Sequence, residues 1–168
     1  DNAYSPRYRG YTYLSLVAEL EPNGPEEAQA LSLIRDWDLH TDTANRNAAL
    51  GVCILLEEWQ AERTGNPLPD ARETLQTCME SVRDVAGQLN PEWGAVQQHG
   101  RGQRTWPAAG GPDTLRAMYA EQLEDEDDFL TVVAGDGLYY LIEWNAEGEQ
   151  TIRGTHQYGS QMIDESSP

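Results

Sequence analysis

Lysine is absent from this chain of 168 residues, and all 11 of its basic residues are arginines. Together with 29 Asp and Glu residues this gives a formal net charge of −18, so the chain lacks the basic face that a phosphate backbone requires. The charge excludes unassisted binding to DNA or RNA and argues against an anionic membrane surface. Apolar runs of about 18 residues, which a membrane-spanning helix needs, are missing too.

Cysteine is scarce. The two cysteines, Cys53 and Cys78, are too few for a disulfide framework, and their spacing is not that of metal ligands. No Cys-x-x-Cys or His-x-x-x-His pair occurs, so we expect no metal site and no cofactor. Whether the two cysteines pair, and in which redox compartment the protein works, stays open at this point.

Two explanations of the acidic, lysine-free composition stand side by side. Dense carboxylates hold water and repel one another, which suits a protein made for high salt. A GC-rich genome that prefers Arg to Lys would give an ordinary acidic protein the same composition. The run 124–128 adds five consecutive acids without the spaced oxygen ligands and turn glycine of a calcium loop, so we expect a solvated loop there.

The first 90 residues predict a four-helix segment, because apolar residues recur every three or four positions. Pro25, followed by two glutamates, is typical of a helix start. Asp42 or Thr41 is expected to cap the third helix, and Asp70 with Glu73 forms a capping-box variant before the fourth. The expected helices cover 8–20, 25–37, 43–61 and 70–89.

The rest of the chain predicts a loop and then strands. Gly, Gln, Pro and Trp without helical period indicate a wrapping loop over 91–128, anchored by Trp93 and Trp106. The segment 129–168 predicts a three-stranded antiparallel meander with turns at Gly135 to Gly137 and at Asn145 to Gly148. The expected strands are 130–134, 137–144 and 151–158.

The middle strand of that meander is apolar on most of both faces. We therefore expect it to lie buried between two layers, one of which helices or sequence outside this chain must supply. The expected fold class is α+β, with a helical first half packed on an antiparallel sheet. The three segments form one structural unit or a fragment of a larger one.

No arrangement of residues predicts a catalytic site. None of the seven serines falls in a Gly-x-Ser-x-Gly motif, and the three histidines are His40, His99 and His156. His156 and Ser160 lie close along a strand end, where we expect the imidazole to bond the backbone rather than act as a base. His40 is expected to complement a helix terminus, and the five tryptophans to anchor core and interfaces.

Several blocks, in order along the chain, are similar to a known family. They are DNAYS at 1–5, LSLIRDWDLHTDTANRNAALGVCILLEEW at 31–59, WGAVQQHGRG at 93–102, GGPDTLRAMY at 110–119, AGDGLYYLIEWNAEGE at 134–149 and HQYGSQMIDESSP at 156–168. Together they resemble the carboxyl-terminal part of the β chain of the penicillin acylase family of N-terminal nucleophile hydrolases. The family's last block continues into a Ser-Pro-His-Tyr ending, whereas this chain stops at Pro168.

The resemblance implies part of an αββα sandwich and an amide hydrolase made as a zymogen that processes itself autocatalytically. Because this chain begins with Asp1, we expect the N-terminal nucleophile and the oxyanion-stabilising Asn to lie on an upstream β segment. The implied partners are that segment, an α chain and a small acyl-amide substrate, and the implied location is the periplasm or the extracellular space. No catalytic residue is carried over to this chain.

Eight residues match family positions that we expect to be structural: Trp37, Asp38, Asp42, Gly135, Asp136, His156, Gly159 and Ser160. Two alternatives remain. One is a non-catalytic binding or scaffold domain of an acidic, salt-adapted protein, with the tryptophan-rich loop as its contact surface. The other is an enzyme of unrelated type that uses His156 or His99.

Overall fold

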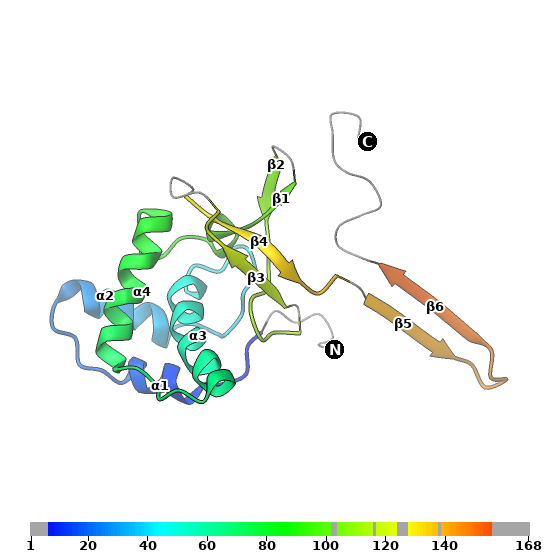
Figure 1. The fold of residues 1–168 in the computed structure, drawn as a ribbon, viewed down its shortest axis with the longest axis horizontal. Coiled ribbons are helices and arrows are strands. Elements are labelled where there is room, and N and C mark those ends of the chain that lie inside the picture. The colour runs from blue at the N-terminus through cyan, green and yellow to red at the C-terminus, as the bar shows by residue number, and fades with distance from the viewer. Residues whose placement is uncertain (1–6, 102–103, 116, 124–127, 138, 156–168) are drawn as a thin grey trace.

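The computed structural model describes residues 7–101, 104–115, 117–123, 128–137 and 139–155 (Figure 1). The described helices are α1 (Thr12–Ala18), α2 (Pro25–Arg35), α3 (Ala48–Thr64), α4 (Ala71–Ala86) and α5 (Trp93–Val96). The strands are β1 (Gln97–Arg101), β2 (Arg104–Pro107), β3 (Met118–Glu121), β4 (Leu130–Gly135), β5 (Tyr139–Trp144) and β6 (Gln150–Thr155). The predicted α+β class is confirmed.

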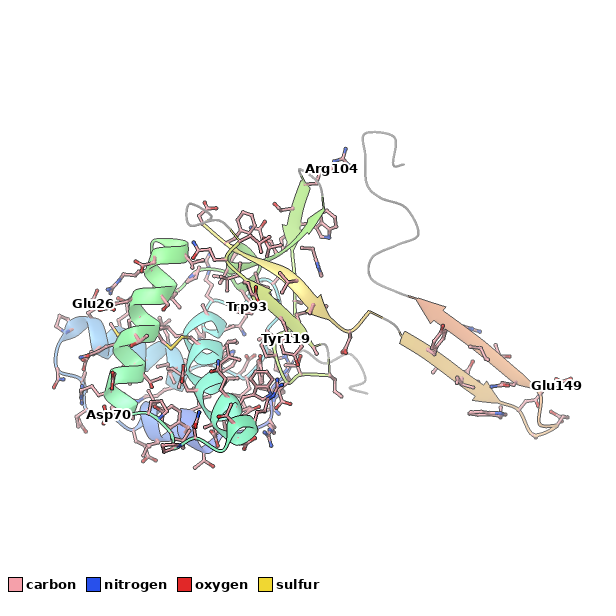
Figure 2. The ribbon with its side chains drawn as sticks, viewed as in Figure 1. Glu26, Asp70, Trp93, Arg104, Tyr119 and Glu149 are labelled. Atoms are coloured by element: carbon pink, nitrogen blue, oxygen red, sulfur yellow. A yellow bond between two sulfur atoms is a disulfide. The ribbon has the colours of Figure 1, made fainter. Side chains whose placement is uncertain are left out.

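The first four helices pack together beside a four-stranded sheet, and a separate β5–β6 hairpin projects away from this body (Figure 1). The starts of α2 and α4 follow local sequence signals. Pro25 is the first residue of α2, and the Asp70 carboxylate accepts hydrogen bonds from the N–H groups of Arg72 and Glu73 at the start of α4 (Figure 2). The cap predicted at Asp70 is therefore confirmed.

The prediction that the third helix begins at 43 is wrong, since α3 begins at Ala48. The carbonyl groups of Thr43 and Asn45 accept hydrogen bonds of 2.8 and 2.9 Å from the N–H groups of Gly94 and Trp93. These two carbonyl groups bond the start of α5 instead of continuing α3. Neither Thr41 nor Asp42, the predicted caps, therefore lies at the start of α3. Hydrogen bonds to α5, which is distant in the sequence, therefore take the place of hydrogen bonds within α3.

The segment 91–128, predicted as a wrapping loop without regular structure, contains α5, β1, β2 and β3. This prediction is wrong. The strand order in the sheet is β2-β1-β4-β3. β1 pairs antiparallel with β2 but parallel with β4, and β3 pairs antiparallel with β4. The sheet is thus mixed, which corrects the predicted antiparallel sheet.

The predicted meander of three strands is also wrong, although its strands lie close to the predicted positions. β4 pairs with β1 and β3, whereas β5 pairs with β6. The N–H of Asp136 donates to the carbonyl of Ala117, and the Asp136 carboxylate accepts from the N–H of Ala117. These two bonds continue the β3–β4 pairing, so the segment after Gly135 does not fold β5 back onto β4.

The core lies among the helices and against α5. Its fully buried side chains include Tyr8, Tyr13, Leu31, Leu50, Ile54, Leu55 and Leu75. Cys53 of α3 and Cys78 of α4 form a disulfide, drawn as a yellow bond between the two helices in Figure 2. This answers the question that the sequence left open.

Candidate functional site

The loop after α2 contains three of the residues expected to be structural, Trp37, Asp38 and Asp42. The indole N–H of Trp37 donates to the carbonyl of His40 at 2.8 Å, and the N–H of His40 donates to the Asp38 carboxylate at 3.0 Å. A Cβ on Gly51 would lie 2.0 Å from the Trp37 ring, so α3 needs a glycine where it meets this indole. The arrangement fixes a turn against α3, and its polar groups bond one another.

His40 itself does not lie at a helix terminus, which corrects its predicted placement. α2 ends at Arg35, and the Nδ1 atom of His40 lies 3.5 Å from the Asp42 carboxylate. A carboxylate beside an imidazole resembles the base and its orienting group in hydrolases. The other described contacts of His40 are made by its backbone with Arg7, Asp38 and Trp37, and none of them supplies a nucleophile.

The other predicted residues lie in the sheet or outside the described residues. A Cβ on Gly135 would lie 2.5 Å from the carbonyl oxygen of Ala117, so this glycine permits close approach of β3 and β4. His156, Gly159 and Ser160 lie outside the described residues. The ring of His99 lies 6.4 Å from that of Trp106 across β1 and β2.

Only some of the tryptophans anchor the core. Trp37 and Trp93 are buried, and the Trp93 indole N–H donates to the carbonyl of Gly110 at 2.9 Å. Trp106 is 38% exposed, so the prediction that it anchors a loop is wrong. Trp144 is 65% exposed at the far end of β5. Sequence reasoning therefore placed the Trp93 anchor correctly and missed that Trp144 reaches solvent.

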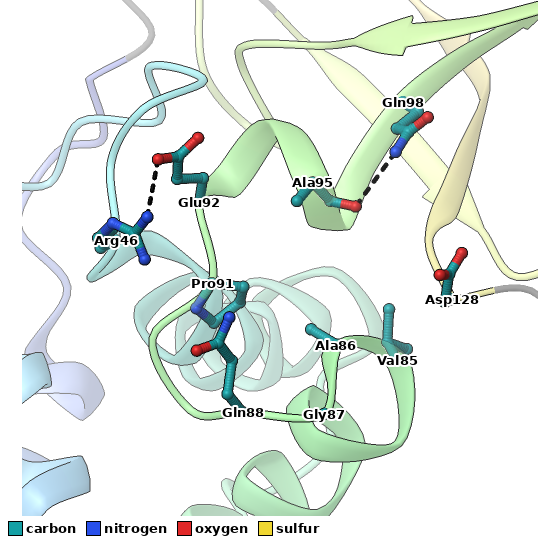
Figure 3. A pocket seen from close by; sticks show the side chains of 10 residues that line it. All are labelled: Arg46, Val85, Ala86, Gly87, Gln88, Pro91, Glu92, Ala95, Gln98 and Asp128. Carbon is teal, nitrogen blue, oxygen red and sulfur yellow. Dashed lines mark hydrogen bonds and ion pairs between the residues drawn. The ribbon is translucent and has the colours of Figure 1, made fainter.

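A surface pocket of about 660 Å³ opens between the end of α4, the start of α5 and Asp128 (Figure 3). The Arg46 guanidinium donates to the Glu92 carboxylate at 2.8 Å, and the Gln98 amide donates to the carbonyl of Ala95 at 3.3 Å. Its lining contains no serine, threonine, cysteine, histidine or tyrosine. The described lining offers hydrogen bonds to a polar solute and the carboxylates of Glu92 and Asp128, but it pairs neither carboxylate with a hydroxyl or thiol nucleophile.

A second polar cluster joins residues that the sequence separates widely. The Tyr11 hydroxyl donates to the Asp113 carboxylate, and the Arg9 guanidinium lies 4.7 Å from the centre of the Tyr11 ring while binding Glu62 at 2.8 Å. Burial and the bond to Asp113 raise the pKa of Tyr11 to about 12. Burial also raises the pKa of Tyr8 far above its usual value. Both phenols stay protonated at neutral pH, so neither serves as a general base.

One side of the β5–β6 hairpin carries an exposed apolar surface, which we call the hairpin face. It consists of Tyr140, Ile142, Trp144 and Ile152, which alternate onto one side of the two strands, with Ile142 directly opposite Ile152. These side chains are 41 to 65% exposed. Within the described residues both strand edges are unpaired, so the predicted burial of this strand between two layers is not found in this chain.

Neither a protein-family model nor a curated protein matches this chain. Among the described residues, no group of three or more His, Cys, Asp or Glu side chains could hold a metal ion. None of the described helices combines the length and apolar character needed to cross a membrane.

Proposed function

We propose that this chain is the carboxyl-terminal portion of the β chain of a penicillin acylase-like amidohydrolase, which cleaves the amide bond between an acyl group and an amine. The observation that carries the proposal is the uncovered hairpin face. An isolated two-stranded hairpin is at best marginally stable in water, and an exposed apolar sheet face marks a missing partner. The ordered sequence blocks point to the same family.

In this proposal the hairpin face packs inside an αββα sandwich whose remaining strands come from the upstream β segment and the α chain. The unpaired edges of β5 and β6 then receive neighbouring strands, which satisfy their backbone N–H and C=O groups. The helices α1 to α5, which we call the helical body, cover one side of the assembled sheets. Trp37 and Asp38 hold the turn that orients α3 within that body.

The chemistry is proposed to lie on the upstream segment. There an N-terminal Ser, Thr or Cys attacks the substrate carbonyl, its own α-amine accepts the proton, and backbone or amide donors stabilise the oxyanion. The proton then passes to the leaving amine, and water releases the acyl group. We expect this chain alone to be inactive, because within the described residues neither the surface pocket nor the Tyr11–Asp113 cluster offers a nucleophile paired with a base.

The Cys53–Cys78 disulfide supports the proposed location. Disulfides form and persist in oxidising compartments such as the periplasm and the extracellular space, and they are rare where thiols are kept reduced. An exported acylase would fold its two cysteine-bearing helices in such a compartment.

The test compares the isolated chain with the complete processed polypeptide on phenylacetyl and aliphatic acyl p-nitroanilides. We expect hydrolysis by the complete polypeptide and none above background by these 168 residues. Sequencing the amino termini of the active protein should find a Ser, Thr or Cys on the upstream chain. Robust turnover by the isolated chain would show that the nucleophile lies within it and would end the proposal.

The second candidate is a non-catalytic binding or scaffold domain of an acidic, salt-adapted protein. The helices favour it, because α1 to α5 enclose a core of their own and a disulfide joins α3 to α4. A complete polypeptide that binds a partner through the hairpin face yet hydrolyses no acyl amide would select this candidate.

A further inference from the structure

A cavity of about 190 Å³ lies between the helices and the inward side of the sheet. Helices α3 and α4 form one wall, and α5 with β1, β3 and β4 forms the other. Its lining consists of Ala49, Val52, Cys53, Leu56, Ser81, Val82, Val85, Trp93, Val96, Gln97, Pro112, Ala120 and Leu130. Among these residues only Ser81 is exposed, so the cavity reaches solvent beside Ser81.

The chemistry of the lining is almost entirely apolar. Its buried polar side chain, Gln97, donates both amide N–H groups, to the carbonyls of Ala108 and Gly110 at 3.2 and 3.0 Å. The Trp93 indole N–H is likewise bonded to Gly110. None of the described lining residues is charged, and placing an ion beside them would carry a large desolvation cost. A ligand of this cavity must therefore be uncharged and mainly hydrocarbon.

The volume sets the size of such a ligand. Protein interiors leave few voids larger than a water molecule, and an apolar cavity of about 150 Å³ in another protein stays dry and binds benzene. The present cavity is somewhat larger and has a disulfide sulfur and an indole in its wall, both of which make favourable contacts with aromatic rings.

We propose that this cavity is a binding site for an uncharged aromatic group of about six to eight carbon atoms, held between α3 of the helical body and β3–β4 of the sheet. The described lining residues hold no nucleophile paired with a base, and the proposal does not rest on amide hydrolysis.

Fluorobenzene is the probe, and fluorine NMR of the full 168-residue chain measures its dissociation constant. Ala49→Leu fills the cavity from α3, and Ala120→Leu fills it from β3, so that failure of one variant to fold leaves the other. Ala28→Leu is the matched control, since it makes the same change at an exposed position of α2. Benzoate tests the exclusion of charge with a ring of the same size.

We expect saturable binding of fluorobenzene by the wild-type chain and by the Ala28→Leu control. Each filling variant should weaken binding about tenfold or more, which corresponds to about 1.4 kcal/mol, and benzoate should not compete. Absence of saturable binding to the wild type, equal binding by all variants, or equal binding of benzoate would each overturn the proposal. None of these outcomes depends on whether the protein is an acylase, because no amide is hydrolysed in the experiment.

Discussion

Cys53 and Cys78 join the middle of α3 to the middle of α4 across 25 residues of sequence. The closed loop contains the end of α3, the glycine and proline turn and the capped start of α4. The disulfide therefore fixes two helices that also form one wall of the apolar cavity.

Removing this disulfide should lower stability substantially. In the chain-entropy model, closing a loop of this length stabilises the folded state by about 3.5 kcal/mol. We expect the double variant Cys53→Ala, Cys78→Ala to lose about that free energy of unfolding in urea titrations. Adding reductant should bring the wild type close to the variant and leave the variant unchanged. Equal midpoints for the two proteins in oxidising buffer would contradict the prediction.

The sequence predicted those features of the fold that depend on neighbours in the chain. Asp70 caps α4 by accepting from the N–H groups of Arg72 and Glu73, and Asn145 with Gly148 forms the β5–β6 turn. Gly148 has a φ of 83°, which glycine adopts without strain. These features depend on residues only a few positions apart, so the apolar pattern and the capping and turn residues of the sequence are sufficient to predict them.

The sequence failed where the outcome depends on distant partners. β1 pairs with β4 through Gln97 opposite Leu130, and no local pattern encodes this parallel register. α3 starts late because the carbonyls of Thr43 and Asn45 bind α5. The apolar cavity and the Tyr11–Asp113 bond join residues from elements far apart in the chain, so periodicity could not have revealed either.

The cap at Asp70 offers a local test of helix stability. Its carboxylate satisfies two N–H groups that would otherwise lack partners within α4. We expect Asp70→Ala to lower the free energy of unfolding by about 1 kcal/mol. Asp84→Ala, an exposed change late in the same helix, should stay within about 0.5 kcal/mol of the wild type. Equal losses for the two variants would argue against a capping role.

Glu27 should make part of the stability depend on pH. The N–H of Asn23 donates to its carboxylate, and the Gln76 amide and Arg72 guanidinium add to this, so the pKa of Glu27 is lowered. Because the folded pKa lies below the unfolded value of about 4.3, the stabilisation is present above that value and is lost as pH falls through the folded pKa.

Urea titrations from neutral pH to about pH 3 should therefore separate Glu27→Gln from the wild type. The difference in unfolding free energy should be greatest near neutrality and should shrink on acidification. Glu80→Gln, at an exposed glutamate of α4, controls for the loss of one negative charge. A difference that stays constant with pH would show that the substitution acts through packing and not through ionisation.

The hairpin face should cause self-association or dye binding in the isolated chain. We expect the double variant Ile142→Thr, Trp144→Thr to reduce binding of a hydrophobic dye, while the unfolding free energy of the body changes by less than about 0.5 kcal/mol. The control Glu143→Gln, Thr151→Ser changes the opposite side of the same strands. Equal dye binding by all three proteins would mean that the exposed apolar surface lies elsewhere.

The acidic composition leads to a last prediction, on salt. Three of the described ion pairs, Arg9–Glu62, Arg46–Glu92 and Arg83–Glu26, are largely exposed, so each contributes little and loses little when screened. Repulsion among 29 acids opposed by 11 arginines is the larger effect, and salt screens it. We therefore expect the melting temperature to rise between about 0.1 M and about 3 M KCl.

Sucrose at matched osmolality provides the control, since it favours compact states without screening charge. A melting temperature that rises equally in sucrose, or does not respond to KCl, would show that charge repulsion does not limit stability and would remove the physical support for salt adaptation.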